Sequence, residues 1–130
     1  MAQITCFGEV LMDVFPTHKK IGGAPLNVAV RLQSFENAIA IISSVGADKK
    51  GKKIVDFIQK NNLNCEGLQV DEQLKTGNVK VSLNSKGSAS YDIKFPRAWD
   101  QIQLTEKAKN ITKEADAFVF GSLVARNEVS

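Results

Sequence analysis

The sequence predicts an α/β fold with a largely parallel sheet and a smaller β segment that is apolar on one face. Three almost uniformly apolar runs, residues 4–8, 38–45 and 117–120, alternate with segments of helical periodicity. Uniformly apolar strands are typical of a sheet covered on both faces, and alternation with helices is typical of right-handed βαβ units. Between residues 79 and 95 apolar and polar residues alternate instead, which predicts a hairpin with one wet face.

Three helices are expected between these strands. The first spans residues 25–35 and starts with a proline, which is favoured at the first helical position. The second spans residues 48–61, with Asp48 as its N-cap and a lysine-rich first turn that we interpret as a solvated face. The third spans residues 105–115 and has a threonine at its N-cap position. Residues 68–70 read as one further short strand.

Composition excludes several classes of protein. The 130 residues suffice for one domain, and 43% apolar and 24% charged residues are typical of a globular protein. A net charge of +3, from 17 basic and 14 acidic residues, is too small to indicate a nucleic-acid partner. The aromatic residues are not interleaved with arginine, so no stacking platform for bases is predicted.

Cysteine usage and apolar runs bear on the expected compartment. Cys6 and Cys65 are the only cysteines, and no Cys/His spacing suits a metal. His18, the only histidine, lies in a lysine-rich loop and is interpreted as solvated. There is no signal-peptide pattern, and the longest apolar run, residues 38–42, is far shorter than the ~20 residues of a membrane span. We therefore expect a cytoplasmic protein without a disulfide, a metal site or membrane contact.

Candidate binding residues lie near strand ends. Asp13 follows the first strand, Gly22 and Gly23 precede the first helix, and Ser122 follows the last strand. Ligands of parallel sheets bind beyond the carboxyl ends of the strands. Glycines let a ligand approach the backbone, and the N–H groups at a helix start suit a polar or anionic ligand. By pattern alone, an ordinary turn around the glycines and a capping role for Asp13 remain open.

Several segments together resemble the start of the ribokinase-like (phosphofructokinase-B type) carbohydrate kinases, and most closely their fructokinase branch. They are residues 7–13 (FGEVLMD), 15–17 (FPT), 22–29 (GGAPLNVA), 45–51 (VGADKKG) and 120–123 (FGSL). The resemblance covers nearly all of this chain but less than half of a family enzyme. It implies the N-terminal part of a three-layer α/β sandwich with a mainly parallel sheet and a small β lid.

Within residues 1–130 the resemblance implies lid segments at about 12–22 and 78–95. The family's second signature, Asp-Thr-x-Gly-Ala-Gly-Asp, supplies the anion hole and the catalytic base, and nothing in this sequence matches it. Asp48 follows Gly-Ala like the tail of that motif, but its place before a basic helix favours the N-cap. We therefore expect an N-terminal fragment that lacks the C-terminal ATP-binding part and is inactive alone.

The resemblance also implies substrate-binding roles. The family's sugar-binding aspartate falls on Asp13, and Asn27 matches an amide that can donate to and accept from a hydroxyl. Gly22 and Gly23 supply the backbone against which the sugar lies, and Ser122 joins them at the strand ends. No catalytic residue and no metal ligand is expected within the chain.

Phe95, Arg97 and Trp99 are further candidates after the second lid segment. Phe95 and Trp99 could each cover the apolar face of a sugar ring, with core packing as an equal alternative. Arg97 resembles an arginine that follows the lid in some fructokinases, although the spacing in residues 95–99 (FPRAW) departs from the usual pattern. Residues 14–22 also form a shorter connection than in most relatives, which leaves open how much of a lid they build.

The implied reaction is transfer of the ATP γ-phosphoryl group to a sugar hydroxyl, most closely that of fructose, with ATP and Mg²⁺ bound mainly by the absent part. Kinases for ribose, keto-deoxygluconate or a nucleoside remain alternatives, although no aromatic sandwich for a nucleoside is evident. A non-catalytic sugar-binding or assembly module is the alternative from another class. The family's lids commonly pair, so a homodimer through the β lid is expected.

Overall fold

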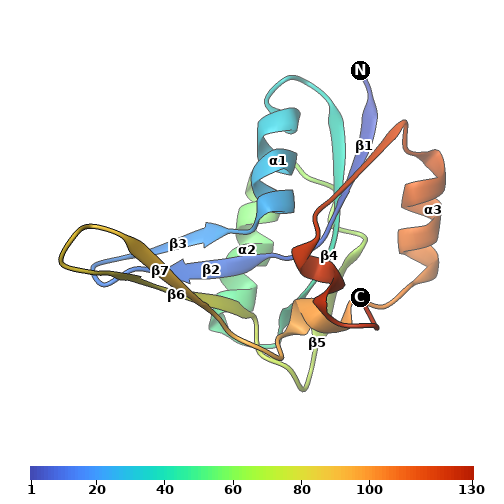
Figure 1. The fold of residues 1–130 in the computed structure, drawn as a ribbon. Helices are drawn as coiled ribbons and strands as arrows, with labels where there is room; N and C mark the ends of the chain where they lie inside the picture. Colours follow the sequence, from blue (N-terminus) through green and yellow to red (C-terminus); the bar gives the residue numbers. More distant parts are fainter.

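The structure, a computed structural model, describes all 130 residues and contains two sheets that meet at an angle (Figure 1). The main sheet has the strand order β5 (Leu68–Asp71), β4 (Ala38–Gly46), β1 (Gln3–Phe7), β8 (Ala117–Phe120). Each neighbouring pair in it is parallel. The predicted parallel sheet is therefore confirmed, and each strand predicted for it agrees with an observed one to within one residue at either end.

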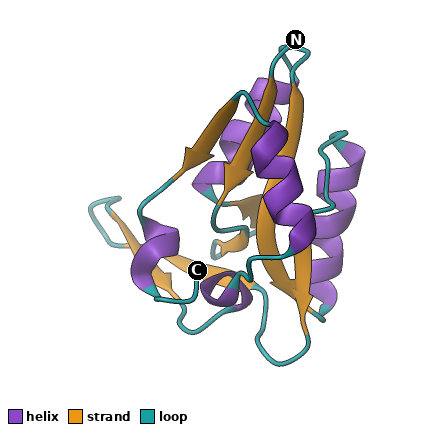
Figure 2. Cartoon of the chain, turned by 90° about the vertical axis from the view of Figure 1, so that its right-hand side faces the viewer, coloured by secondary structure: helices purple, strands orange, loops and turns teal.

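Helices cover both faces of the main sheet, which gives three layers (Figures 1 and 2). On one face lie α1 (Ala24–Gln33) and α2 (Lys49–Lys60), and on the other lies α3 (Glu106–Glu114). The larger core cluster joins the sheet to α1 and α2 through residues that include Ile41, Leu26 and Ile54. A smaller cluster on the opposite face includes Ile42, Trp99 and Ala108.

The second sheet, which we call the lid sheet, has four strands. Their order is β3 (Lys19–Gly22), β2 (Leu11–Val14), β6 (Gly77–Leu83), β7 (Ala89–Ile93). The pairing of β2 with β6 is parallel, and the two outer pairings are antiparallel. The short connection after Asp13 therefore does build a strand, β3, because a tight turn returns the chain along β2.

One face of the lid sheet is apolar, as the alternation predicts. Leu11, Val79 and Val81 form a small buried cluster there, with Phe15 packed against it. The apolar residues of β7 remain exposed, and among them Tyr91 is 65% accessible. The lid sheet therefore carries apolar surface that the rest of the chain does not cover.

Strand β8 differs from its prediction. Its apolar run predicts burial on both faces, yet Phe118 is 43% and Phe120 68% exposed. The reason is its position at the edge of the main sheet, where it pairs only with β1 and where both rings line an open groove. Phe35, the last residue of the first predicted helix, lies beyond the end of α1 and is 63% exposed.

Two short 3₁₀ turns complete the chain, η1 (Ala98–Gln101) and η2 (Leu123–Arg126). They contact each other below the carboxyl ends of β1 and β8. None of the helices has both the length and the apolar character needed to cross a membrane.

Asp48 caps α2 as predicted, and it also ties this helix to the segment before β6. Its Oδ1 accepts hydrogen bonds from the Gly51 N–H at 2.8 Å and the Thr76 hydroxyl at 2.6 Å. Its Oδ2 accepts one from the Thr76 N–H at 3.0 Å. Burial alone would raise the pKa of Asp48, but these hydrogen bonds and the charge of Lys50 lower it overall.

We expect Asp48→Ala to reduce the free energy of unfolding by about 2 kcal/mol, because a cap and further hydrogen bonds are lost together. Since the folded-state pKa is lowered, this stabilisation is fully present above the unfolded-state pKa of about 4 and disappears as pH falls through the folded-state pKa. Urea unfolding over a pH series measures it. Asp56→Ala, in the exposed part of the same helix, is the control. An Asp48→Ala effect that persists undiminished in acid would contradict the role of the charge.

Candidate functional site

The Asp13 carboxylate lies directly over Gly22. Asp13 is the third residue of β2, and a Cβ atom built on Gly22 would stand 2.5 Å from its Oδ2. No group in the chain donates a hydrogen bond to this carboxylate, and the nearest opposite charge is on Lys20, its register partner on β3. Burial raises the pKa of Asp13, against the effect of Lys20. A half-buried carboxylate with free acceptor positions suits the hydroxyl groups of a ligand.

The position of Asp13 corrects one detail of the prediction. It was expected just past the end of a strand of the main sheet, but it lies inside a strand of the lid sheet. β1 ends at Phe7 and β2 begins at Leu11, so a second strand follows the first after a connection of only three residues.

Gly23 joins the two sheets at the start of α1. Its φ of 109° is in a region that favours glycine, and a Cβ atom there would overlap the main-chain oxygen of Glu9. The Gly23 carbonyl in turn accepts the Asn27 N–H at 3.0 Å. The glycine pair therefore brings β3, the start of α1 and the connection between β1 and β2 into close contact.

Asn27 does not meet Asp13 in this structure. It lies in the first turn of α1, is exposed, and lines a surface hollow together with Met12 and Ile21. Met12 alternates with Asp13 along β2, so this hollow opens on the other face of the lid sheet. Of the residues that the resemblance implies, Asp13, Gly22 and Gly23 are thus gathered together, and Asn27 is apart from the carboxylate.

Phe95, Trp99 and Arg97 lie in three different environments. Phe95 follows β7 and is 59% exposed, whereas Trp99 is completely buried beside Ile102 in the smaller core cluster. For Trp99 the core alternative therefore applies, because no ligand can reach a ring without accessible surface. Arg97 is half-buried, and its charge acts on Lys50. Burial lowers the pKa of Lys50, and the charges of neighbouring cations, Arg97 among them, lower it further.

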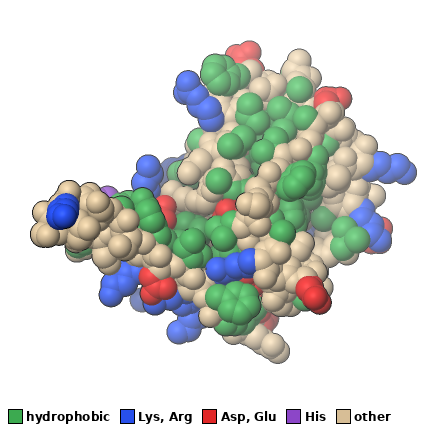
Figure 3. All heavy atoms as spheres, viewed as in Figure 1, with side chains coloured by type: hydrophobic (Ala, Val, Ile, Leu, Met, Phe, Trp, Pro, Cys, Tyr) green, Lys and Arg blue, Asp and Glu red, His purple; other side chains and the backbone are tan.

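Ser122 lies beyond the carboxyl end of β8, where it is exposed and makes no capping hydrogen bond. The chain contains no group of three or more His, Cys, Asp or Glu side chains that could hold a metal ion. Figure 3 shows the angle between the lid sheet and the main sheet lined by apolar side chains, with acidic and basic groups among them.

Three charged residues near the angle between the two sheets were not among the candidates predicted from the sequence: Glu9, Asp100 and Arg126. Glu9 is 3% exposed, and its Oε1 has no hydrogen-bond partner. Burial raises the pKa of Glu9, against a backbone hydrogen bond and the charge of Arg126. Asp100 is fully buried and pairs with Arg126. Glu9 lies inside the segment FGEVLMD. Asp100 and Arg126 are 26 residues apart in the sequence, so no local pattern predicts their ion pair.

Comparison with known proteins agrees with the resemblance seen in the sequence. Residues 1–128 match the profile of the pfkB family carbohydrate kinases. Fructokinase-2 of Oryza sativa subsp. japonica is 31% identical over 134 residues, which cover 92% of this chain and 40% of that protein.

Solved structures show the same fold. An uncharacterised sugar kinase from Pyrococcus horikoshii superposes with a TM-score of 0.85 at 29% identity, covering 95% of this chain and 46% of that one. The same kinase in complex with ATP also gives a TM-score of 0.85. Halothermothrix orenii fructokinase gives a TM-score of 0.84 at 22% identity, covering 94% of this chain and 47% of that one, which supports the fold alone.

The matches cover nearly all of this chain but only part of each relative. The chain spans less than half the length of each of these relatives. Within that span the α/β fold with its parallel sheet corresponds to the N-terminal part of ribokinase-like kinases. From the match over residues 1–128, the chain belongs to the pfkB family of carbohydrate kinases.

Proposed function

We propose that this chain is the sugar-binding part of an ATP-dependent carbohydrate kinase whose substrate is fructose. The observation that carries the proposal is the half-buried Asp13 carboxylate, free of internal donors and held over Gly22. Two donor hydroxyls of a sugar would satisfy its oxygens, and the glycine backbone lets the ring approach closely. Fructose is the preferred substrate because fructokinases recur among the relatives in sequence.

The chain's own contribution to phosphoryl transfer is to hold the acceptor. Such reactions depend on positioning and on charge stabilisation, and effective orientation alone lowers a barrier substantially. ATP is the proposed phosphoryl donor, in keeping with the ATP complex of the Pyrococcus horikoshii relative. The residues present offer no carboxylate cluster for Mg²⁺, so we assign the nucleotide and its metal to the part of the relatives that this chain does not match.

Calorimetric titration of the 130-residue chain with several sugars tests this proposal. Fructose is expected to bind, with ribose, keto-deoxygluconate and adenosine weaker, and a coupled assay with ATP and fructose is expected to show no turnover. Preferred binding of keto-deoxygluconate or ribose would reassign the substrate. Absence of binding to all four would contradict the sugar-binding role, and turnover that scales with protein would contradict the assignment of catalysis elsewhere.

We also propose that the lid sheet pairs with that of a second copy. The exposed Tyr91 and Ile93 lie on the same face as Val81 and Val79, their register partners, and thus extend the apolar face beyond its buried part. Contiguous exposed apolar surface of this kind is typical of an interaction site, so such a face gains from apolar cover. Both cysteines are free thiols, which fits a cytoplasmic location for the assembly.

We expect Tyr91→Asp to convert a dimer into a monomer, because a charge on the apolar face would be buried without a partner. Light scattering measures the mass. The matched control is Ser90→Asp, one residue along the same strand, where the side chain points to the other face. A dimer that survives Tyr91→Asp, or a parent chain that is monomeric, would rule out pairing through this face.

A further inference from the structure

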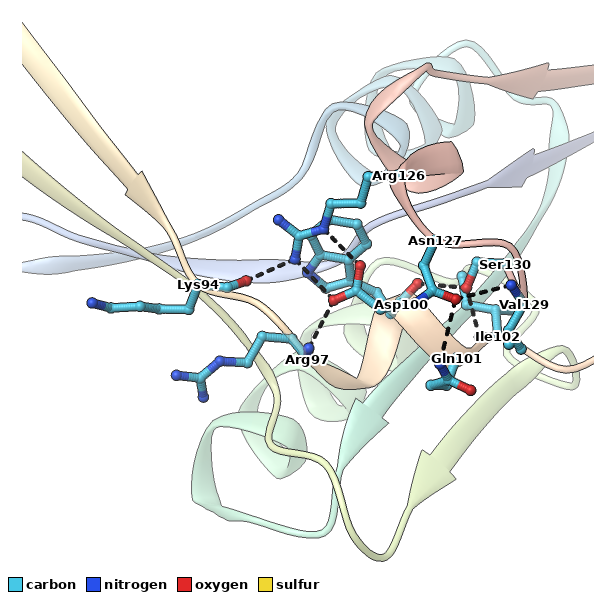
Figure 4. Close-up of polar contacts among 10 residues, drawn as sticks. Lys94, Arg97, Asp100, Gln101, Ile102, Arg126, Asn127, Val129 and Ser130 are labelled. Carbon is cyan, nitrogen blue, oxygen red and sulfur yellow. Dashed lines mark hydrogen bonds and ion pairs between the residues drawn. The ribbon is translucent and has the colours of Figure 1, made fainter.

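Asp100, which is fully buried, forms an ion pair with Arg126, whose side chain is 21% exposed (Figure 4). Arg126 Nε donates to Asp100 Oδ1 at 2.6 Å, and Nη2 donates to Oδ2 at 2.8 Å. The same Oδ2 accepts the Arg97 N–H at 2.7 Å. Desolvation offsets much of the attraction in such a pair, so its presence is weak evidence for a role in stability alone. The two-pronged geometry does fix the guanidinium plane.

The fixed guanidinium then contacts the segment that returns from the lid sheet. Its Nη2 also donates to the main-chain oxygen of Lys94 at 2.7 Å, immediately beyond β7. The guanidinium carbon lies 3.9 Å from the ring centre of Trp99 and 4.9 Å from that of Phe95. One side chain therefore joins the end of β7, the turn η1, and the loop that follows β8.

Phe95 is the exposed member of this group. Trp99 has no accessible surface, whereas Phe95 keeps 59% of its own. An aromatic ring needs a fixed orientation if it is to cover the C–H face of a sugar, because an unrestrained ring loses side-chain entropy on binding. Contact with the guanidinium restrains Phe95 while leaving much of its surface free for a ligand.

The charge of Arg126 also acts on the buried Glu9. Glu9 follows β1, the central strand, at the carboxyl edge where ligands of parallel sheets bind. The charge of Arg126 favours the ionised form of Glu9, against the effect of burial on its pKa. Arg126 therefore stands between the base of the lid sheet and the carboxyl end of the main sheet.

We infer that Arg126 is a positioning residue for sugar binding: clamped by Asp100, it holds Phe95 over the sugar and couples the base of the lid sheet to the loop after β8. This inference rests on the proposed sugar-binding function. It assigns Phe95 the ring-covering role and Trp99 the role of a support beneath the guanidinium.

The test compares three single variants of the 130-residue chain and the double variant of Arg126 and Phe95. Arg126→Lys keeps the charge but loses the two-pronged hydrogen bonding and the planar stacking surface. Phe95→Leu changes only the exposed ring and leaves the ion pair in place. The matched control is Arg31→Lys, because Arg31 lies 5.0 Å from the ring centre of Phe35 on exposed surface in the last turn of α1, at the opposite end of this helix from Gly23.

Two readouts separate positioning from a structural role. The fructose dissociation constant is measured well below the unfolding midpoint of each variant. The emission of Trp99, the only tryptophan, is recorded with and without fructose. We expect Arg126→Lys and Phe95→Leu each to weaken binding about tenfold, and the double variant to be no weaker than about the worse single variant. The sugar-induced change in Trp99 emission should disappear in Arg126→Lys and persist in Arg31→Lys.

The outcomes distinguish this inference from the proposed function. A parent chain that binds none of the tested sugars overturns the proposed function and, with it, this inference. A parent that binds fructose while Arg126→Lys binds equally well, with the same emission change, overturns the positioning role alone. If Arg126→Lys does not fold, Phe95→Leu decides: weaker binding supports the placement of the ring, and parental affinity overturns it.

Discussion

Asp13→Asn is expected to weaken fructose binding about a hundredfold while leaving the fold at least as stable. A hydrogen bond to a charged group contributes roughly 1.5–3 kcal/mol. Replacing the carboxylate by an amide removes the charge from two such bonds, and a loss of about 2.7 kcal/mol corresponds to a factor of about a hundred. Calorimetric titration with fructose measures the affinity, and urea unfolding measures the stability.

Asp13→Asn is expected to weaken fructose binding without weakening the fold, because burial raises the pKa of Asp13. A raised carboxyl pKa means that the folded state binds its proton more tightly than the unfolded state. Stability therefore falls as pH rises through the interval between the two pKa values, and the ionised group is a cost at neutral pH. Binding requires the ionised form, so in the parent chain it should weaken as pH falls through the raised pKa, above the ordinary aspartate value of about 3.9.

Asp92→Asn is the matched control for Asp13→Asn. Asp92 lies on β7 of the same sheet, pairs with Lys80 in register, and makes an exposed ion pair with Lys94. Its side chain is on the face opposite that of Asp13. Equal losses of fructose affinity in both variants would show a general effect of charge on the lid sheet, and an unchanged Asp13→Asn variant would remove Asp13 from the site.

Local patterns in the sequence were sufficient for most of the fold. Apolar runs predicted the strands of the main sheet, and helix periodicity with cap residues such as Asp48 and Thr105 predicted the helices. The exposure of β8 could not be predicted in this way, because an apolar run is compatible with both a central and an edge position. Which position a strand takes depends on pairings between distant segments.

The candidate site was predictable only where a motif is local. Gly22 and Gly23 stand beside each other in the sequence, so the pair can be recognised as a position where the backbone is approached closely. In the structure Gly22 lies against Asp13 and Gly23 against Glu9. The pair of Asp100 and Arg126 joins positions with no local signal. The burial of Trp99 likewise depends on packing beside Ile102, which composition around position 99 does not reveal.

Gly23→Ala is expected to reduce the free energy of unfolding by about 3 kcal/mol or more. Two other glycines of this chain separate the effect of steric overlap from the effect of the backbone conformation. At Gly23 an added Cβ meets three main-chain atoms of Glu9 and Val10, and backbone cannot move aside as a flexible side chain can. The φ of 109° is unfavourable as well, at a cost of about 1–2 kcal/mol for a residue with a side chain.

Gly87→Ala measures the backbone contribution alone, since φ is 79° and no atom lies within 4 Å of an added Cβ; we expect a loss of about 1 kcal/mol. Gly121→Ala has neither feature, so its stability should stay within about 0.5 kcal/mol of the parent. Urea unfolding of the three variants is expected to show the smallest loss of stability for Gly121→Ala, a larger one for Gly87→Ala and the largest for Gly23→Ala. Because Gly23 holds the start of α1 against the connection between β1 and β2, Gly23→Ala should also weaken fructose binding in the fraction that remains folded. A Gly23→Ala variant no less stable than Gly87→Ala would show that the two sheets can separate at this point without cost, and the site would then not be preformed.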